Sequence, residues 1–563
     1  MSSTCLGPSR VSRSRCTREK LSSDLCLLHK RFSTNFKLKM ENVLPFEAVS
    51  IDLIPSVHQR VVDKFHTHTT RPVEYRLKQL RSLYWGLKDA EPALLEACKL
   101  DLGKSAYEAY LTEVGWVLND IIFMSKNLAR FAKDESAPDI DLTNKFMRPK
   151  IRKDPLGAVL IIGAYNFPLQ LSLGPLVGAI AAGCTAVLKP SESAPNAARI
   201  MQHVVAKSLD PEAYQVLQGA VPETTALLDC KWDKIFYTGG LTVGRIIAKK
   251  AAETLTPVAL ELGGRNPAII TKNADPRLAA RRLLWAKLLN VGQVCVSQNY
   301  ILIDKDILPE FIRQLELALI EFQPKGAEGN SDYGKIINER QWKRLKDMLD
   351  STNGKILLGG KKDQSALFFE PTVVQVSSPD DSLLKDESFG PLMPILPVDD
   401  LDEAIRISNK VHPTPLGIYP FGSTAETNQI LSQTRSGGAS VNDAFFHASI
   451  PTLAFGGVGD SGQGSYRGRA SFECFTHHRS VTTTPSWIEG MLDVRYPPFT
   501  DAKFKKLKSM TEQKPNFNRQ GRETGGWVWW TLGLGSKGLT GGVTRWAIVA
   551  AVAVVVSVLR ARV

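Results

Sequence analysis

The sequence predicts an α/β protein built on parallel β-sheets, and its hydrophobic pattern, length and composition support that prediction. From Pro155 onward, short apolar segments alternate with helical segments, which is the pattern of a parallel sheet with crossover helices. The 563 residues suffice for about two to four domains. Apolar residues make up 43% of the chain and charged residues 23%, close to globular averages. We therefore expect most of the chain to fold around a substantial core.

The predicted elements follow from local periodicity. Residues 56–135 are expected to be helical, because apolar side chains recur there at spacings of three and four. The polar, irregular segment 136–154 is expected to be an excursion or arm. The apolar runs predict strands over 158–162, 186–188, 234–237 and 258–262, a helix over 168–182, and a helix that follows Gly244 and runs to Lys250. A second α/β segment is expected over roughly 267–440.

The net charge of +13 is concentrated at the two ends of the chain. Residues 1–40 carry nine Lys/Arg against two Asp/Glu, and residues 490–563 carry twelve against four, which leaves a net charge of −2 for the body between them. A nearly neutral body argues against nucleic acid as a partner. The eight cysteines are too sparse for a disulfide scaffold and form no CxxC pair or Cys/His cluster, so no metal site is predicted.

The N-terminal 40 residues are rich in Ser and Arg. That composition fits a mitochondrial transit peptide, a disordered basic tail, or a start codon placed upstream of the true start at Met40.

The C-terminal end combines a Lys- and Gly-rich stretch with an uncharged apolar run from Trp546 to Leu559. Fourteen helical residues span about 21 Å, less than the ~30 Å hydrocarbon core, but extension back to Leu539 reaches a spanning length. Arg545 would then extend toward the headgroups, where nearby Trp side chains would also lie. We expect a membrane anchor here, with a helix or strand docked on the protein as the alternative.

Several short motifs could carry chemistry, although each is weak alone. Glycines over Thr238–Gly244 follow a strand and open a helix, where backbone N–H groups could approach a phosphate; a tight turn is the alternative. Lys189 and Glu192 follow another strand and could hold ribose hydroxyls or simply form a solvated loop.

Three further residues have the chemistry of an active site. Cys295 follows a turn that contains Gly292 and could be a reactive thiolate or a buried inert cysteine. Glu261 ends an apolar strand and could be a general base. Asn166 lies between a strand and a helix and could be a helix cap or an oxyanion donor.

The joint order of these motifs is far more specific than any one of them. In chain order the motifs are Pro155-Leu156-Gly157, Asn166-Phe167-Pro168, Lys189-Pro190-Ser191-Glu192, Gly239 to Gly244, Glu261-Leu262-Gly263-Gly264, Gly292-Gln293-Val294-Cys295, Glu387-Ser388-Phe389-Gly390-Pro391 and Phe455-Gly456-Gly457-Val458-Gly459. With this set, over roughly residues 55–480, the chain resembles the aldehyde dehydrogenase superfamily, and its hydrophobic tail resembles the class 3 branch of membrane-bound fatty aldehyde and fungal apocarotenal dehydrogenases.

The resemblance implies a division of the chain into parts. These are a basic N-terminal tail (1–45), a Rossmann-like NAD(P)-binding domain (46–135 and 155–262), an α/β catalytic domain (263–440), oligomerisation or bridging segments that include a small β arm (136–154 and 441–489), a basic Gly-rich linker (490–538) and an apolar membrane anchor (539–560).

The resemblance also implies roles for individual residues. Cys295 would attack the aldehyde carbon, Asn166 and the Cys295 N–H would hold the oxyanion, and Glu261 would activate the water that hydrolyses the thioester. The remaining matched positions would bind the cofactor: Lys189, Glu192, Gly239, Gly240, Gly244, Glu387 and Phe389. Glu192 favours NAD as the cofactor, because a carboxylate accepts a hydrogen bond from the ribose 2′-OH and repels a 2′-phosphate. Use of NADP is the alternative.

Four positions depart from common family residues, namely Gly240, Phe167, Val294 and Ala454. They leave the reaction type intact but bear on pocket shape and cofactor preference. Aromatic side chains could line an apolar substrate channel, with core packing as the alternative for each: Tyr110, Trp116, Phe445 and Phe446.

The sequence therefore predicts NAD(P)-dependent oxidation of long-chain (fatty) aldehydes to acids. The alternatives are the same chemistry on apocarotenal or aromatic aldehydes, thiol esterase activity alone, and an inactive membrane-tethered scaffold. A homodimer and a lipid membrane are the expected partners. The catalytic body would be cytosolic, on the endoplasmic reticulum, mitochondrial outer membrane, peroxisome or lipid droplet.

Overall fold

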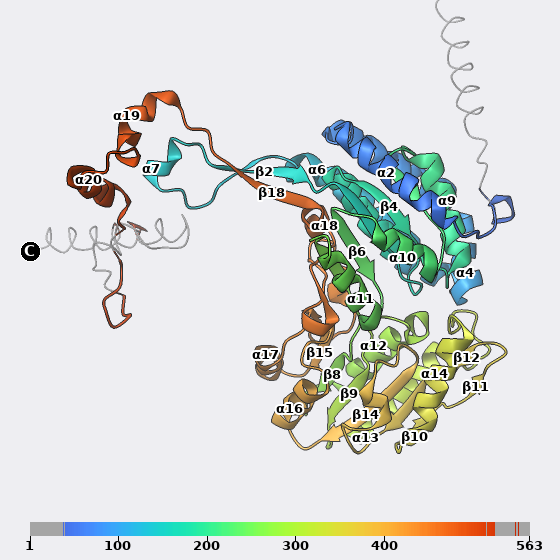
Figure 1. The fold of residues 1–563 in the computed structure, drawn as a ribbon. Coiled ribbons are helices and arrows are strands. Elements are labelled where there is room, and N and C mark those ends of the chain that lie inside the picture. Colours follow the sequence, from blue (N-terminus) through green and yellow to red (C-terminus); the bar gives the residue numbers. More distant parts are fainter. Residues whose placement is uncertain (1–37, 39, 514, 524–545, 548–549, 551–563) are drawn as a thin grey trace, which may run out of the picture. The chain divides into compact units, whose positions relative to one another are not determined.

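The computed structural model describes residues 38, 40–513, 515–523, 546–547 and 550, which fall into two compact units. The larger unit runs to Glu135 and resumes over Arg152–Arg479. The smaller unit holds Ser136–Ile151 and the described residues from Ser480 onward. Both large sheets belong to the larger unit (Figure 1).

The first sheet has six strands in the order β17-β7-β6-β3-β4-β5, all parallel except β17. Their bounds are β3 (Ala158–Ile162), β4 (Thr185–Lys189), β5 (Tyr214–Val216), β6 (Lys234–Thr238), β7 (Val258–Glu261) and β17 (Gly462–Gln463). The chain adds β4 and β5 on one side of β3 and then returns to add β6 and β7 on the other. Sheets with such a reversal bind ligands at the carboxyl ends of the strands that flank it.

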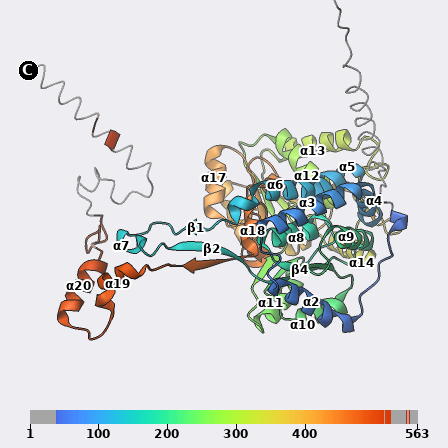
Figure 2. The same ribbon diagram turned by 90° about the horizontal axis from the view of Figure 1, so that it is seen from above.

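Helices cover both faces of this sheet. Figure 2 shows α2 (Ile54–His66), α10 (Val221–Asp229) and α11 (Leu241–Ala252) on one side of β4. The same view shows a second group on the other side: α3 (Val73–Asp89), α6 (Gly115–Phe131), α8 (Gln170–Ala182) and α9 (Pro195–Ser208). Alternate residues of β3 enter the two cores, Leu160 on the α2 side and Ile161 on the α8 side. Burial on both faces explains why these strands read as continuous apolar runs.

The strands and helices predicted for this part of the chain are observed, although α11 begins at Leu241, before Gly244, and α8 begins at Gln170. The strand over 158–162 is observed with those bounds, and the other three predicted strands differ by one residue at one or both ends. Residues 54–131 are largely helical, with the remaining elements α4 (Glu91–Leu102), α5 (Ala106–Ala109) and the π-helical segment η3 (Tyr110–Val114). Edge strand β5 was not predicted, because three residues are too few to show a periodicity.

The second sheet has seven strands in the order β10-β13-β14-β9-β8-β15-β16, parallel except for β10. Their bounds are β8 (Pro267–Ile270), β9 (Tyr300–Asp304), β10 (Lys355–Leu358), β13 (Thr372–Gln375), β14 (Leu392–Val398), β15 (Gly417–Phe421) and β16 (Gly438–Ala439). The helices around it are α12 (Pro276–Leu288), α13 (Leu308–Phe322), α14 (Glu339–Asp350), α15 (Ser382–Lys385), α16 (Leu401–Val411) and α17 (Thr424–Gln433), and a hairpin adds β11 (Lys362–Asp363) and β12 (Phe368–Phe369).

The chain returns to the first sheet after the second is complete. Strand β17 pairs antiparallel with β7, so that Gly462 lies opposite Glu261. Helix α18 (Arg469–Cys474) then packs against α8. Residues 441–479 thus belong to the larger unit, and the segment predicted as one bridging piece over 441–489 is divided near Arg479.

A three-stranded sheet in the order β1-β2-β18 corresponds to the predicted small β arm. Its strands are β1 (Glu135–Ser136), β2 (Lys150–Pro155) and β18 (Thr476–Val481), and the short helices of the smaller unit are α7 (Leu142–Lys145) and α19 (Glu489–Leu492).

The predicted Gly-rich linker over 490–538 contains a helix, α20 (Asp501–Thr511). The Thr500 hydroxyl caps this helix by accepting from the Lys503 N–H at 3.3 Å, a local signal that the Lys-rich composition obscured. Within the part of the chain that the structure describes, no helix is long and apolar enough to cross a membrane. The predicted anchor, 539–560, lies outside the described residues except at 546, 547 and 550. Of the predicted N-terminal tail, 1–45, residues 1–37 and 39 also lie outside them.

Candidate active site

The carboxyl ends of four parallel strands form one row along the edge of the first sheet. Ile162 of β3 pairs in register with Lys189 of β4 and with Tyr237 of β6, and Thr238 of β6 pairs with Glu261 of β7. Two residues predicted for the site, Lys189 and Glu261, are therefore set on the same edge by strand register alone. They flank the point where the strand order reverses.

Lys189 and Glu192 form an ion pair at one end of this row, with 2.8 Å between Lys189 Nζ and Glu192 Oε2. Lys189 is buried, whereas the Glu192 side chain is 39% exposed. Burial alone would raise the pKa of Glu192, but the hydrogen bond and charge of Lys189 outweigh it and hold this pKa below its ordinary value. Glu192 is thus an anion that can accept hydrogen bonds from a ligand.

The N-terminus of α11 follows β6 directly. Gly240 is the N-cap residue, and the first-turn N–H groups of α11 have no intrahelical partner, which makes the turn an anion site. A Cβ at Gly240 would meet nothing within 4 Å, so the approach is open, whereas a Cβ at Gly239 would lie 2.2 Å from the Tyr237 hydroxyl. A Cβ at Gly244 would lie 2.8 Å from Leu262, so this glycine lets the helix pack closely on β7. The Thr238 hydroxyl beside this turn has no hydrogen-bond partner among the described residues.

Glu387 and Phe389 belong to the loop between α15 and β14, which lies against Gly263. A Cβ at Gly263 would lie 2.1 Å from the Glu387 carboxylate. The motif over 261–264 is therefore in direct contact with the motif over 387–391. Arg344 fixes this loop by donating from Nη1 to the Glu387 carbonyl at 3.0 Å. Burial raises the pKa of Glu387 to about 7 despite the neighbouring cations. Phe389 has a positive φ of 48°, and its ring meets Tyr165 edge-on at 6.0 Å between centroids.

The chain reaches Cys295 through a strained turn. Asn290, Val291 and Gly292 are consecutive residues with φ of 47°, 56° and 72°. A β-branched residue such as Val291 rarely has a positive φ. Each non-glycine residue in this conformation lowers the stability of the fold by about 1–3 kcal/mol, which contacts in the surrounding structure must offset.

Asn266 supplies much of that support, and sequence analysis missed it. Its side-chain amide donates to the carbonyls of Cys295 and Ser297, both at 2.8 Å, and accepts from the Gly417 N–H at 2.9 Å. One fully buried side chain thus ties the cysteine loop to the start of β8 and to β15. It follows the Gly263-Gly264 pair closely, but a polar residue before a strand gives no sign of that role.

Asn166 is brought to the same loop. Its Nδ2 donates to the Gln293 carbonyl at 3.1 Å, two residues before Cys295, and its own carbonyl accepts from Asn290 Nδ2 at 2.8 Å. The structure therefore unites Asn166 with the cysteine turn although about 130 residues separate them in the chain.

A buried ion pair between Lys104 and Glu113, which sequence analysis also missed, supports the segment that carries Asn166. Lys104 and Glu113 are fully buried and lie 2.7 Å apart. Lys104 Nζ also donates to the Asn166 carbonyl at 3.0 Å, and Glu113 accepts from the N–H groups of Leu169 and Gln170 at 3.0 and 3.1 Å. The burial of Glu113 could have been predicted from its position. It lies on the same helix face as the buried apolar residues Val117, Ile121, Met124 and Leu128, at spacings of three and four.

The surroundings of Cys295, which is partly buried, and of Glu261, which is buried, disfavour the charged form of each side chain. Burial, followed by the charges of Glu387 and Glu261, raises the pKa of the Cys295 thiol to about 12. Burial alone raises the pKa of Glu261 well above its ordinary value, and neither carboxylate oxygen has a hydrogen-bond partner within the described residues. A buried carboxyl group without a partner is costly and is a mark of functional sites.

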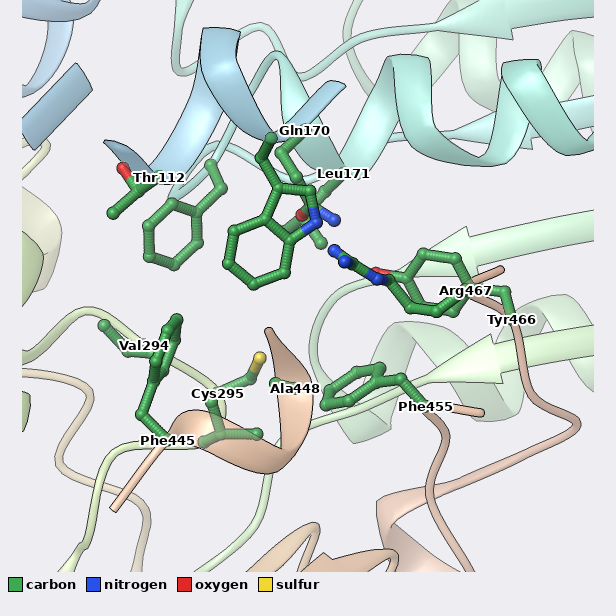
Figure 3. A pocket seen from close by; sticks show the side chains of 13 residues that line it. Thr112, Gln170, Leu171, Val294, Cys295, Phe445, Ala448, Phe455, Tyr466 and Arg467 are labelled. Carbon is green, nitrogen blue, oxygen red and sulfur yellow. The ribbon is translucent and has the colours of Figure 1, made fainter. Parts of the chain in front are cut away.

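Cys295 opens into a largely apolar pocket (Figure 3). It is lined by Thr112, Trp116, Phe167, Gln170, Leu171, Val294, Cys295, Val296, Phe445, Ala448, Phe455, Tyr466 and Arg467. Of the four aromatic residues expected to line a channel, Trp116 and Phe445 do so. Tyr110 and Phe446 are instead about half exposed and are not among the lining residues.

The comparisons with known proteins agree with this site. Residues 46–481 match the model of the Aldehyde dehydrogenase family. The chain is 51% identical over 513 residues to "Beta-apo-4'-carotenal oxygenase" of Neurospora crassa, covering 90% of this chain and 96% of that one. It is 40% identical over 446 residues to "Aldehyde dehydrogenase, dimeric NADP-preferring" of Mus musculus, covering 79% and 98%. A solved structure, "Substrate bound state of Staphylococcus Aureus AldH", superposes with a TM-score of 0.79 at 36% identity, covering 82% and 99%.

The chain therefore belongs to the aldehyde dehydrogenase family and is an NAD(P)-dependent oxidoreductase with that fold. Within the family, its relatives include class 3 aldehyde dehydrogenases and fungal apocarotenal oxygenases.

Proposed function

We propose that this enzyme oxidises long, apolar aldehydes to carboxylic acids through a covalent adduct on Cys295. The observation that carries the proposal is the position of Cys295 at an apolar pocket, on a turn that is hydrogen-bonded to Asn166. An aldehyde oxygen that receives hydrogen bonds from the Asn166 amide and the Cys295 N–H would be stabilised as it becomes an alkoxide. One such donor contributes about 3–4 kcal/mol to a transition state.

Cys295 acts first as nucleophile. The Cys295 thiol loses its proton to solvent, the sulfur bonds to the aldehyde carbon, and the electron pair of the C=O double bond moves to the oxygen, which becomes the oxyanion that Asn166 holds. When bound, NAD(P) supplies the acceptor for the hydride that leaves this carbon. Glu261 then takes a proton from the water that attacks the Cys295 thioester, which releases the acid and restores the thiol. The burial that raises its pKa makes the Glu261 carboxylate a stronger base than one in water.

The residues along the sheet edge fit the cofactor. The open N-terminus of α11 at Gly240 suits a pyrophosphate, and the unpartnered Thr238 hydroxyl lies beside it. Lys189 and Glu192 would hold the adenosine ribose. Glu387 would hold the nicotinamide ribose, with Phe389 against the ring.

We propose that NAD is preferred and NADP accepted. Glu192 is held anionic by Lys189, so it would accept from a ribose 2′-OH and repel a 2′-phosphate. Steady-state kinetics with both cofactors test this. Glu192→Gln should shift the kcat/KM ratio toward NADP, and an unchanged ratio would contradict the assignment.

The substrate proposal is a long-chain aldehyde, and two classes compete within it. The apolar lining of the pocket suits a saturated fatty aldehyde, which the sequence pattern favoured. The two relatives at 51% and 46% identity, both named for beta-apo-4'-carotenal, favour a polyene aldehyde. A panel of hexadecanal, an apocarotenal and benzaldehyde, with reduced cofactor formation as the readout, decides between them. Fastest turnover of benzaldehyde would contradict the proposal of a long substrate.

We further propose that residues 539–560 anchor the enzyme to a membrane and that the enzyme is a homodimer. The support is the uncharged apolar run from Trp546 to Leu559 beside Lys- and Arg-rich sequence, and the mouse relative named as dimeric. Deletion of residues 525–563 should move the protein from the membrane fraction to the supernatant. A membrane fraction unchanged by the deletion would exclude this anchor, and sedimentation of the shortened chain would report its subunit number.

A further inference from the structure

Arg467 is an unusual residue for an apolar substrate pocket. It is 4% exposed, lines the same pocket as Cys295, and has a positive φ of 80°. Such a backbone conformation in a non-glycine residue persists only where its surroundings fix it. The Ser471 hydroxyl does so here, by accepting from the Arg467 N–H at 2.8 Å.

Among the described residues, only one guanidinium nitrogen of Arg467 has polar partners. Nη2 lies 3.4 Å from the Asp120 carboxylate and donates to the Ser449 carbonyl at 3.2 Å. Nε and Nη1 are fully buried and have no hydrogen-bond partner among the described residues. Figure 3 shows the nitrogen end of Arg467 directed in among the side chains that line the pocket.

A second unsatisfied donor lies beside it. The Arg467 guanidinium lies 4.2 Å from the ring centroid of Trp116, and Trp116 Nε1 is also buried without a partner in the described part of the chain. The Thr112 hydroxyl, another polar group of the lining, already donates to the Glu108 carbonyl at 2.8 Å. Two side chains that line the pocket therefore carry buried N–H groups without an acceptor among the described residues, which is a cost unless a ligand supplies one.

We propose that Arg467 and Trp116 bind a second oxygen function of the substrate, remote from the carbon that Cys295 attacks. This inference rests on the proposed function. The enzyme would thus take long aldehydes that carry a ketone, ester or hydroxyl oxygen at their far end.

The substrate oxygen that accepts hydrogen bonds from Arg467 and Trp116 is expected to be uncharged. Asp120 already lies beside Arg467, so the buried pair is neutral as a whole, and a further carboxylate would bring an unbalanced charge into a dry pocket. A neutral oxygen accepts from the free N–H groups without that penalty.

The test is a series of aldehyde pairs matched in chain length, one ending in a methyl group and the other carrying a ketone near its far end. At the length that reaches Arg467, kcat/KM should favour the keto-aldehyde by about tenfold or more, since a hydrogen bond to a charged donor has that magnitude. Arg467→Met should bring this ratio close to one. Arg467→Lys keeps a charge beside Asp120 but loses the planar set of donors, and it should lower the ratio as well.

Arg469→Met is the matched control, because Arg469 is about half exposed and pairs with Glu135 and Glu473 outside the pocket. It should keep the wild-type ratio. A wild-type ratio near one at every length, a loss of activity in Arg467→Met that leaves the ratio unchanged, or a preference for an ω-carboxylate over the ketone would overturn the inference. Failure to oxidise any aldehyde would instead overturn the proposed function.

Discussion

The buried pair of Lys104 and Glu113 gives the sharpest test of how the site is held. Glu113→Gln leaves the Lys104 ammonium buried without its counter-ion. It also replaces the carboxylate, one oxygen of which accepts hydrogen bonds from the N–H groups of Leu169 and Gln170, with an amide. Loss of one partner of a buried pair typically costs about 3–5 kcal/mol of stability. We expect a clear fall in the denaturant midpoint of the full chain.

The same substitution should reduce catalysis, because Lys104 and the backbone at Leu169 hold the segment that carries Asn166. Full loss of the Asn166 donor would cost about 10²–10³ in kcat, which sets the upper bound. The double variant Lys104→Met/Glu113→Gln removes both charges and keeps an acceptor for the backbone, so it should regain stability but not full activity. Glu310→Gln, the same change in an exposed pair with Arg313, is the control and should alter neither quantity. Wild-type stability and kcat/KM in Glu113→Gln would refute this reasoning.

Three further predictions concern the reacting groups. Asn166→Ala should lower kcat by about 10²–10³ with little change in the denaturant midpoint, and a loss below tenfold in a folded variant would remove Asn166 from the oxyanion site. Glu261→Gln should give one burst of reduced cofactor per site in stopped-flow measurements and then stall at the thioester, and an unaltered steady state would show that another base serves. Because burial raises the pKa of Cys295 to about 12, the thiolate fraction of the ligand-free enzyme should grow about tenfold per pH unit, and its alkylation, followed by peptide mapping, should show no plateau below about pH 10. A plateau near pH 8 would contradict this environment.

Much of the site could be predicted because strand register determines it. Lys189 and Glu261 end parallel strands, so apolar runs of the right length were enough to place them on one edge. Cys295 and Asn166 could not be united by pattern alone. Their proximity depends on a strained turn and on hydrogen bonds between distant segments.

The missed residues share a physical reason. Lys104, Asn266 and Arg467 are polar side chains whose partners are carbonyls or charges far away in sequence, and a single sequence gives no sign of such pairing. Lys, Arg and Asn side chains are mostly exposed in folded proteins, so the ordinary expectation for each was a solvated surface. The return of residues 441–479 to the first sheet was missed for a related reason, since β17 has only two residues.

The central claim is that Cys295 forms the covalent adduct through which the aldehyde is oxidised. Formation of reduced cofactor from a long-chain aldehyde, compared between the wild-type chain and Cys295→Ala, tests it most directly. The account predicts steady formation by the wild type and none above background by a folded Cys295→Ala. Equal rates in the two proteins would contradict it.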